Sequence, residues 1–267
     1  MPDIVVAGAA GRMGSRLVAR LGDAPDLRLV AALEAPGHGA LGRDAGELAG
    51  VGRLGVVVTD DPAAAIAPDR VLVEFSAPEA SVAHLRLVAR AGARAVVGTT
   101  GFGAAERREI EDLARRAAIL VSPNMSVAVN VAFTLLATMA KALGDDYDVE
   151  ITEIHHRFKK DAPSGTALRM AEIVAGALGR DLGRVAVYGR QGLPGERPRH
   201  EIGILSLRSG DVVGEHTVSF GTLGERLELT HRAHSRDTLA RGAVRAARWI
   251  AGRPPGLYSM QDVLGLG

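Results

Sequence analysis

Residues 8–14 read GAAGRMG and lie between a short apolar run at residues 4–7 and the beginning of a helical pattern. A glycine-rich turn in this position can bind the pyrophosphate of a dinucleotide. Glycine lets the backbone approach the phosphates closely, and the helix N-terminus offers N–H groups and partial positive charge. The spacing is G-x-x-G-x-x-G, however, and not the usual G-x-G-x-x-G. The turn alone therefore fits a tight connection in any α/β domain equally well.

Glu34 favours the dinucleotide interpretation. It ends the second apolar run, 20 residues after Gly14, where an acidic residue contacts the adenosine ribose hydroxyls in such folds. On its own, Glu34 could be a solvated loop carboxylate. The turn, the strand before it and Glu34 together predict a dinucleotide site. A P-loop is excluded, because no Lys-Ser/Thr pair follows the glycines.

The first half of the chain alternates short apolar runs with amphipathic stretches. Near-continuous apolar strands separated by helices indicate βαβ units and a parallel sheet covered on both faces. We therefore predict a Rossmann-like parallel-sheet domain. Its strands are expected at residues 4–7, 27–33, 56–59, 71–75, 95–99 and 119–122, with helices at 79–91 and 104–117.

Two loops of this domain follow expected strands on the same edge as the glycine turn. They contain Gly98, Thr99 and Thr100 in one case, and Ser122, Pro123, Asn124 and Met125 in the other. Ligands of open α/β sheets bind at the carboxyl ends of the strands. Either loop could be a plain turn, but their position predicts contacts on the nicotinamide side of a cofactor.

The pattern changes near residue 125, which predicts a second, smaller α+β domain. A long apolar helix is expected at 126–143, a strand at 148–156, a helix at 166–178 and a long loop at 183–200. Three strand-like runs then follow each other directly, and a last helix is expected at 236–250. Consecutive strands joined by turns at 210–211 and 222–224 indicate a mixed or antiparallel sheet; the runs lie at 202–208, 215–220 and 226–230.

Composition narrows the possible functions. The chain has 32 basic and 31 acidic residues, a net charge of +1 and only 3% aromatic residues, so neither a basic surface nor stacking platforms point to nucleic acid. It has no cysteine, which excludes thiolate catalysis and zinc–cysteine sites. No apolar run approaches the ~20 residues that span a bilayer, and the chain enters a strand pattern almost at once. We therefore expect a cytoplasmic protein without a membrane partner.

A local cluster of cations contrasts with the balanced total charge. Residues 155–168 read HHRFKKDAPSGTAL. Charge runs are usually solvated faces, but this one ends an expected strand and leads into a helix start, where Ser164 or Thr166 can cap the helix. The N–H groups of Gly165 and Thr166 would add an anion site beside the cations. The combination suits a small substrate with more than one carboxylate, or with a phosphate.

The two adjacent histidines differ in their expected direction. In an extended strand His155 and His156 point to opposite faces, so they are poor partners for chelating one metal, and no metal site is expected. An imidazole can supply a proton near neutral pH, and Lys159 can hydrogen-bond a carboxylate or help to protonate a carbanion-like centre. With a dinucleotide site, these residues favour hydride transfer to an electrophilic carbon, followed by protonation.

Several segments resemble the 4-hydroxy-tetrahydrodipicolinate reductase family, formerly called dihydrodipicolinate reductase. The most distinctive is EIHHRFKKDAPSGTAL. The others include GAAGRMG, VGTTGF, SPNMSVAVN, VGEHTVSF, GERLELTHRAHSR and the closing GLYSMQDVLGL. The resemblance implies NADH- or NADPH-dependent reduction of a cyclic imine dicarboxylate, with loss of water, in lysine and diaminopimelate biosynthesis.

The resemblance also implies roles for single residues. His155 matches the family's proton donor and Lys159 its second catalytic residue. The expected substrate-binding set is His156, Ser164, Gly165, Thr166 and Arg236. The expected cofactor-binding set is Gly8, Ala9, Ala10, Gly11, Arg12, Met13, Glu34, Gly98, Thr99, Thr100, Ser122, Pro123, Asn124 and Met125.

For the whole chain, the resemblance implies a dinucleotide-binding domain of residues 1–125 and 237–267. A substrate-binding and oligomerisation domain of residues 126–236 would mediate a homotetramer.

One departure from the family concerns the cofactor. Some members carry Arg after the glutamate of strand two or in the F-S-A-P-E segment, whereas this chain has Ala35 and Ala77. A carboxylate beside the ribose repels a 2′-phosphate, so we expect NADH to serve at least as well as NADPH, although Arg12 could still meet a phosphate.

Two alternatives remain open at the level of sequence. One is a related NAD(P)-dependent amino-acid or aldehyde dehydrogenase, although the absence of cysteine removes the thiol-dependent aldehyde enzymes. The other is a catalytically inactive dinucleotide-sensing protein, against which the presence of both His155 and Lys159 argues.

Overall fold

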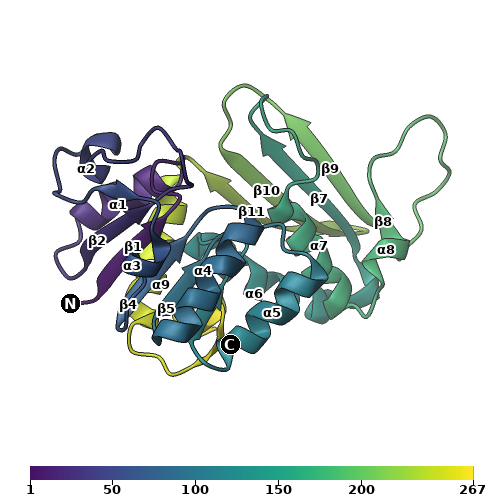
Figure 1. Ribbon diagram of the computed structural model, residues 1–267. Coiled ribbons are helices and arrows are strands. Elements are labelled where there is room, and N and C mark those ends of the chain that lie inside the picture. Colours follow the sequence, from purple (N-terminus) through teal and green to yellow (C-terminus); the bar gives the residue numbers. More distant parts are fainter. Residues whose placement is uncertain (267) are drawn as a thin grey trace. The chain divides into compact units, whose positions relative to one another are not determined.

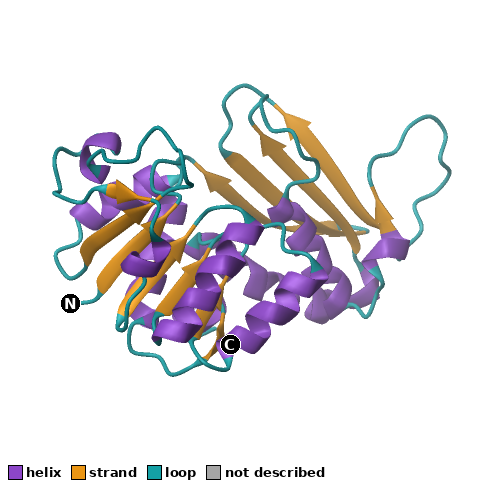
Figure 2. Cartoon of the chain, in the orientation of Figure 1, coloured by secondary structure: helices purple, strands orange, loops and turns teal. Residues whose placement is uncertain are grey.

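A computed structural model describes residues 1–266, which form two compact units. Unit 1 contains Met1–Val127 and the segment from Asp237 onward, and unit 2 contains Ala128–Arg236. Figures 1 and 2 show strands and helices in both units. The return of the last segment to unit 1 means that the chain leaves this unit once and comes back.

Unit 1 is built on a seven-stranded parallel sheet in the order β12-β6-β5-β4-β1-β2-β3. The order reverses at β1, which lies between β2 and β4. Such a reversal is the switch point where open α/β sheets bind ligands. The prediction of a Rossmann-like parallel sheet is confirmed. Its strands are β1 (Asp3–Ala7), β2 (Arg28–Leu33), β3 (Val58–Thr59), β4 (Arg70–Glu74), β5 (Arg94–Val97), β6 (Ala118–Val121) and β12 (Gly256–Tyr258).

Helices cover both faces of this sheet, and alternation along the strands explains why (Figure 1). In β1, Ile4 and Val6 pack into one core cluster, while Val5 and Ala7 pack into the other. Because strand side chains alternate between faces, a strand buried on both sides is apolar throughout. The first cluster is covered by α1 (Gly14–Gly22), α9 (Asp237–Ile250) and α10 (Met260–Leu264), and the second by α3 (Pro62–Ala65), α4 (Pro78–Ala91) and α5 (Ala104–Ala114).

Unit 2 has a five-stranded mixed sheet in the order β11-β10-β7-β9-β8. Strand β10 is antiparallel to both β7 and β11, whereas β9 is parallel to β7 and β8. The prediction of a mixed sheet is therefore confirmed. The strands are β7 (Asp148–His155), β8 (Ala186–Val187), β9 (Ile202–Arg208), β10 (Gly214–Thr222) and β11 (Glu225–Ala233).

Helices α6 (Val127–Leu143) and α7 (Gly165–Ala177) cover one face of this sheet. Phe133 and Leu136 from α6, Met170 from α7, and Ile151 and Phe220 from the sheet share one buried core. Residues 149, 151, 153 and 155 of β7 therefore face the helices, since every second residue shares a face.

Two expectations need correction. The segment 183–200 is not all loop, because α8 (Leu182–Val185) and β8 occupy its beginning. Strands β9 and β10 do not form a hairpin, since β7 lies between them. In addition, four short elements were not predicted: helices α2 (Ala45–Leu48) and α3, strand β12 and helix α10. These elements are short, and periodicity is weak over so few residues.

Helix α6 with the turn after it, residues 127–146, is long and apolar enough to cross a membrane by length and composition. The sequence-based expectation that no stretch approaches this length is therefore wrong. The observation is weak support for a membrane span, because the core helix of a soluble protein passes the same test. Phe133, Leu136 and Ala140 of α6 are buried in the core of unit 2.

Candidate functional site

The glycine turn of unit 1 is shaped so tightly that two of its glycines cannot be replaced without displacement. Gly8 has φ 72°, and a Cβ atom there would lie 2.7 Å from the carbonyl oxygen of Phe75. A Cβ atom at Gly14 would lie 2.0 Å from the carbonyl oxygen of Gly8. The third glycine, Gly11, donates its N–H to that same oxygen at 3.0 Å. The G-x-x-G-x-x-G spacing thus folds the turn back on itself at the start of α1.

Glu34 fastens the end of β2 to this turn. Its Oε1 accepts a hydrogen bond from the backbone N–H of Ala10 at 2.8 Å, and the N–H groups of Gly8 and Ala9 donate to the carbonyl of Leu33. The acidic residue predicted for the ribose therefore lies directly beside the predicted pyrophosphate turn. Of the two remaining residues of the turn, Arg12 is exposed and Met13 is partly buried.

The other two predicted cofactor loops are joined to the same edge of the sheet, the loop after β5 through Phe75, which follows β4, and the loop after β6 through β5. A Cβ atom at Gly98 would lie 2.2 Å from the Phe75 ring, so a side chain there would displace this ring. In that loop Thr99 is buried and receives a hydrogen bond from Ser81, whereas Thr100 is exposed. The N–H of Ser122 donates to Val97, which fixes the loop after β6 to β5.

The loop after β6 is held by its own side chains. The Ser122 hydroxyl donates to the carbonyl of Asn124, and the Asn124 side-chain oxygen accepts from the N–H of Ser126. Pro123 is exposed, whereas Met125 is buried. A Cβ atom at Gly242 in α9 would lie 1.7 Å from the Met125 carbonyl oxygen, so α9 packs directly under this loop. The structure thus ties all four predicted cofactor segments to one edge of unit 1.

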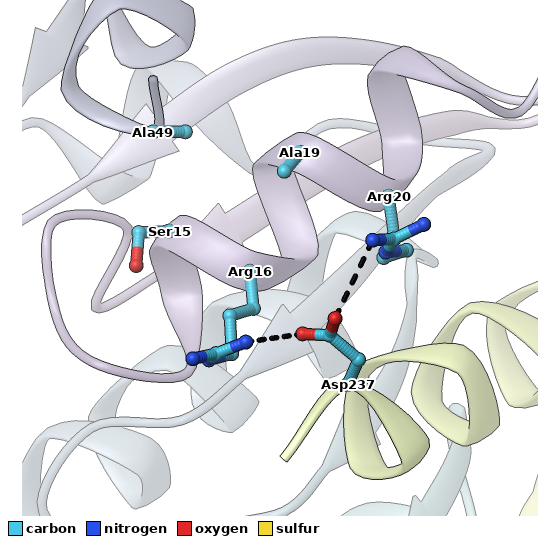
Figure 3. A pocket seen from close by; sticks show the side chains of 6 residues that line it. All are labelled: Ser15, Arg16, Ala19, Arg20, Ala49 and Asp237. Atoms are coloured by element: carbon cyan, nitrogen blue, oxygen red, sulfur yellow. Dashed lines mark hydrogen bonds and ion pairs between the residues drawn. The ribbon is translucent and has the colours of Figure 1, made fainter. Parts of the chain in front are cut away.

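A pocket of about 300 Å³ also lies in unit 1, beside α1, and contains none of the predicted site residues (Figure 3). Arg16 and Arg20 point from α1 toward Asp237 at the start of α9, and both form ion pairs with it. The carboxylate therefore already engages the two cations that could attract an anion, and we assign this pocket no role.

The histidines of unit 2 are gathered by the register of its sheet. Glu153 in β7 is opposite His216 in β10, which in turn is opposite His231 in β11. On the other side of β7, His155 is opposite Arg208 in β9. Directly opposed residues share a face. These five side chains, which are far apart in sequence, therefore lie on the helix-covered face at one end of the sheet.

His155 is held by Glu153, which is fully buried. The Nδ1 of His155 lies 2.6 Å from Glu153 Oε2, and the Arg208 guanidinium donates to both carboxylate oxygens at 2.9–3.1 Å. Burial alone would raise the pKa of Glu153, but the hydrogen bonds from Arg208 and His155 hold it below its ordinary value. An ionised carboxylate only accepts hydrogen bonds, so Nδ1 of His155 carries the proton in this contact.

The same carboxylate reaches the helix that follows. Glu153 Oε1 accepts from the backbone N–H of Ser164 at 3.1 Å. Ser164 caps α7, because its hydroxyl accepts from the N–H of Ala167, and it also contacts His216 Nε2 at 2.9 Å. Gly165 and Thr166 are the first two residues of α7, as the sequence predicts for an anion-binding helix start.

His216 is buried and stays neutral. Burial first, and the nearby His155 second, lower its pKa to about 3. Its ring lies edge-on to that of His155 with the centroids 5.2 Å apart. Burial also lowers the pKa of His155, which Glu153 partly offsets.

Of the remaining predicted residues, two contact each other and the third pairs with a residue that was not predicted. Arg236 donates to Nε2 of His156 at 3.1 Å. The ammonium group of Lys159 lies 2.7 Å from a carboxylate oxygen of Asp161, and its charge acts on His155. Sequence reasoning missed Glu153, Arg208 and His216. Glu153 could have been found, because a residue two before His155 in a strand shares its face, whereas the other two are connected to it only by strand pairing.

Comparisons with known proteins show the family of this chain. The model of "Dihydrodipicolinate reductase, N-terminus" matches residues 2–125, and that of "Dihydrodipicolinate reductase, C-terminus" matches residues 128–264. The chain belongs to the dihydrodipicolinate reductase family. The expected family resemblance is thereby confirmed. The break between the two family models falls beside the division between units 1 and 2.

Two full-length relatives carry the same name. The 4-hydroxy-tetrahydrodipicolinate reductases of Citrifermentans bemidjiense and Geobacter sulfurreducens are 53% and 52% identical to this chain over 266 residues, which cover 100% of each chain. Among solved structures, the dipicolinate-bound dihydrodipicolinate reductase from Paenisporosarcina sp. TG-14 has a TM-score of 0.74 at 24% identity, covering 98% of both chains. That likeness supports the dihydrodipicolinate reductase fold.

Proposed function

We propose that this chain catalyses the NAD(P)H-dependent reduction of 4-hydroxy-tetrahydrodipicolinate, a cyclic imine dicarboxylate, to tetrahydrodipicolinate in lysine and diaminopimelate biosynthesis. The substrate gains one hydride and one proton and loses one water. The observation that carries the proposal is the carboxylate-held His155 beside the N-terminus of α7, in a chain whose full-length relatives bear this enzyme's name.

Unit 1 fits a dinucleotide. Side chains at Gly8 and Gly14 would collide with backbone, so the turn at the start of α1 stays bare where a pyrophosphate would approach, and Glu34 lies beside it. When bound, the reduced nicotinamide supplies the hydride. The residues that would hold the cofactor are those of the glycine turn, Glu34 and the loops after β5 and β6. The structure offers no arginine immediately after Glu34, which favours NADH.

Unit 2 fits a dicarboxylate and a proton donor. We assign proton donation to Nε2 of His155, because Nδ1 is bound by Glu153 and, among residues 1–266, Nε2 has no hydrogen-bond partner. Lys159 is held by Asp161 and would contribute positive charge near the reacting carbon. His156, Ser164, Gly165, Thr166 and Arg236 would bind the substrate carboxylates through charge and through the N-terminus of α7.

Two further proposals concern the assembly. We expect a homotetramer in the cytoplasm. Leu205 and Leu207 are exposed on the face of the unit 2 sheet that points away from α6 and α7, and an apolar surface of this kind suits contact with another copy.

The alternatives of an amino-acid or aldehyde dehydrogenase are not favoured, since the full-length relatives named above are all reductases of the cyclic imine.

The test is consumption of NADH or NADPH with the cyclic imine generated in the same cuvette. Steady turnover that depends on both the imine and the enzyme is the expected result. Binding of cofactor without turnover would favour the dinucleotide-sensing alternative, and turnover of an amino acid or aldehyde but not of the imine would favour a dehydrogenase. Pyruvate and other simple carbonyl compounds serve as substrate controls.

A further inference from the structure

Glu153 is a buried carboxylate that enters the proposed chemistry only as the partner of His155 Nδ1. It lies on the helix-covered face of β7 after Val149 and Ile151, which are both completely buried. An apolar residue would continue the core pattern at this position. A buried charge is unfavourable unless it is paired and hydrogen-bonded, and here His155, Arg208 and the Ser164 N–H all bind it. The break in the pattern thus coincides with a complete set of partners for one carboxylate.

The contact with His155 determines which ring nitrogen can react. The hydrogen bond at Nδ1 fixes the tautomer and the orientation of the imidazole, as carboxylates do for functional histidines generally. Nε2 then points away from Glu153, toward Gly214, where a Cβ atom would lie only 3.0 Å from it. Glycine at this position in β10 therefore leaves room beside the reactive nitrogen.

The other contacts of Glu153 connect His155 to the substrate-binding segment. Oε1 accepts from the N–H of Ser164, the residue that caps α7. Arg208, which holds both carboxylate oxygens, also donates to the carbonyl of Asp161 at 2.7 Å. One carboxylate and one guanidinium thus link the imidazole to the loop of Lys159 and Asp161 and to the start of α7.

We propose that Glu153 is the positioning residue of this site: it orients His155 with Nε2 toward the substrate, stabilises the protonated ring, and keeps the ring in register with the N-terminus of α7. This inference rests on the proposed function, in which His155 donates the proton.

The charges around His155 set the direction of the expected pH effect. The groups that face the ring are Glu153 from β7, Arg208 from β9, His216 from β10 and Lys159 from the loop after β7. Burial lowers the pKa of His155. The positive charges of Lys159 and Arg208 lower this pKa further, and among these groups only Glu153 raises it. Removal of the Glu153 charge therefore leaves less of the protonated donor at any given pH.

The test compares Glu153→Gln with Glu150→Gln. Glu150 lies on the same strand, and its carboxylate also binds two arginines, Arg190 and Arg197. Because Glu150 is three residues from Glu153, its side chain lies on the opposite face of the sheet. We expect Glu153→Gln to lower kcat about 10- to 100-fold while KM for NADH stays within about twofold. The high-pH limb of the kcat profile should move to lower pH by about one unit. Glu150→Gln should keep the wild-type kcat and profile.

A second measurement does not need turnover. Nitrogen-15 NMR of the histidine rings in the free protein should show His155 protonated at Nδ1 in the wild type and in Glu150→Gln, and a mixture of tautomers in Glu153→Gln. The proposal is overturned if Glu153→Gln keeps the wild-type pH profile, or if the tautomer of His155 does not change. If the wild type fails to reduce the imine, the proposed function is wrong, but the NMR result still decides whether Glu153 positions the ring.

Discussion

At the end of β2, the Glu34 carboxylate is bound to the N–H of Ala10 in the glycine turn. A 2′-phosphate near this group would meet a negative charge, and the next residue is Ala35 in place of an arginine that could offset it. We therefore expect kcat/KM with NADH to equal or exceed that with NADPH. Glu34→Gln should lower kcat/KM for NADH about tenfold, since a hydrogen bond to a charged acceptor is weakened, and should lower it less for NADPH. A strong preference of the wild type for NADPH would contradict this assignment.

His216 gives a pH prediction that concerns stability and not catalysis. Its pKa is lowered to about 3 by burial, whereas an unfolded chain would protonate it near its ordinary value of about 6.5. Between these values the unfolded state binds the extra proton, so stability falls as the pH decreases, by up to about 1.4 kcal/mol per pH unit. Above the ordinary pKa of histidine, the contribution of His216 to the free energy of unfolding no longer changes with pH.

The test is chemical unfolding of the wild type and of His216→Gln between pH 7 and pH 5, a range that covers the ordinary pKa of histidine. The variant should lose less stability over this range, because it has no imidazole to protonate on unfolding. His200→Gln, at an exposed position, should keep the wild-type slope. If the free energy of unfolding changed equally with pH in the wild type and in His216→Gln, burial of this ring would not contribute to the pH dependence of stability.

Among the elements, the junction of β1 and α1 depends on glycine at particular positions. Gly14→Ala would place a methyl group 2.0 Å from the Gly8 carbonyl oxygen, and the resulting strain should destabilise unit 1 by about 1–3 kcal/mol. It should also weaken NADH binding, because the turn must move. Gly22→Ala, at the other end of the same helix, meets only a leucine methyl group at 3.9 Å and should be neutral or slightly stabilising. Thermal unfolding and NADH titration of both variants would decide the matter, and equal behaviour would contradict the close approach seen at Gly14.

The elements also show what sequence can and cannot predict. The parallel strands of unit 1 could be predicted because Ile4, Val5 and Val6 are buried on both faces and read as a continuous apolar run. The helix start at Gly165 was indicated by its serine cap. The pairing of β7 with β9 and β10 could not be predicted, since a strand's partners are fixed by contacts far away in the chain. For that reason Arg208 and His216 became visible only through the register of the sheet.

For the whole molecule, the exposed Leu205 and Leu207 on the unit 2 sheet lead to a prediction about assembly. Light scattering after size-exclusion chromatography should give four times the chain mass of 27.8 kDa. The double variant Leu205→Asp, Leu207→Asp should shift the protein to smaller species, because charges would be buried at the contact. Leu257→Asp, an exposed leucine of unit 1, is the matched control and should leave the mass unchanged. A monomeric wild type would contradict the tetramer.

In the proposed function, His155, held by Glu153, supplies the proton in reduction of the cyclic imine. This role is tested by kcat of His155→Ala with NADH and the imine generated in situ, measured together with the Kd for NADH. We expect kcat to fall about 10²- to 10⁴-fold, as for loss of a general acid, while the Kd for NADH stays near that of the wild type, because no residue of the glycine turn is changed. A variant that retains wild-type turnover would contradict the account.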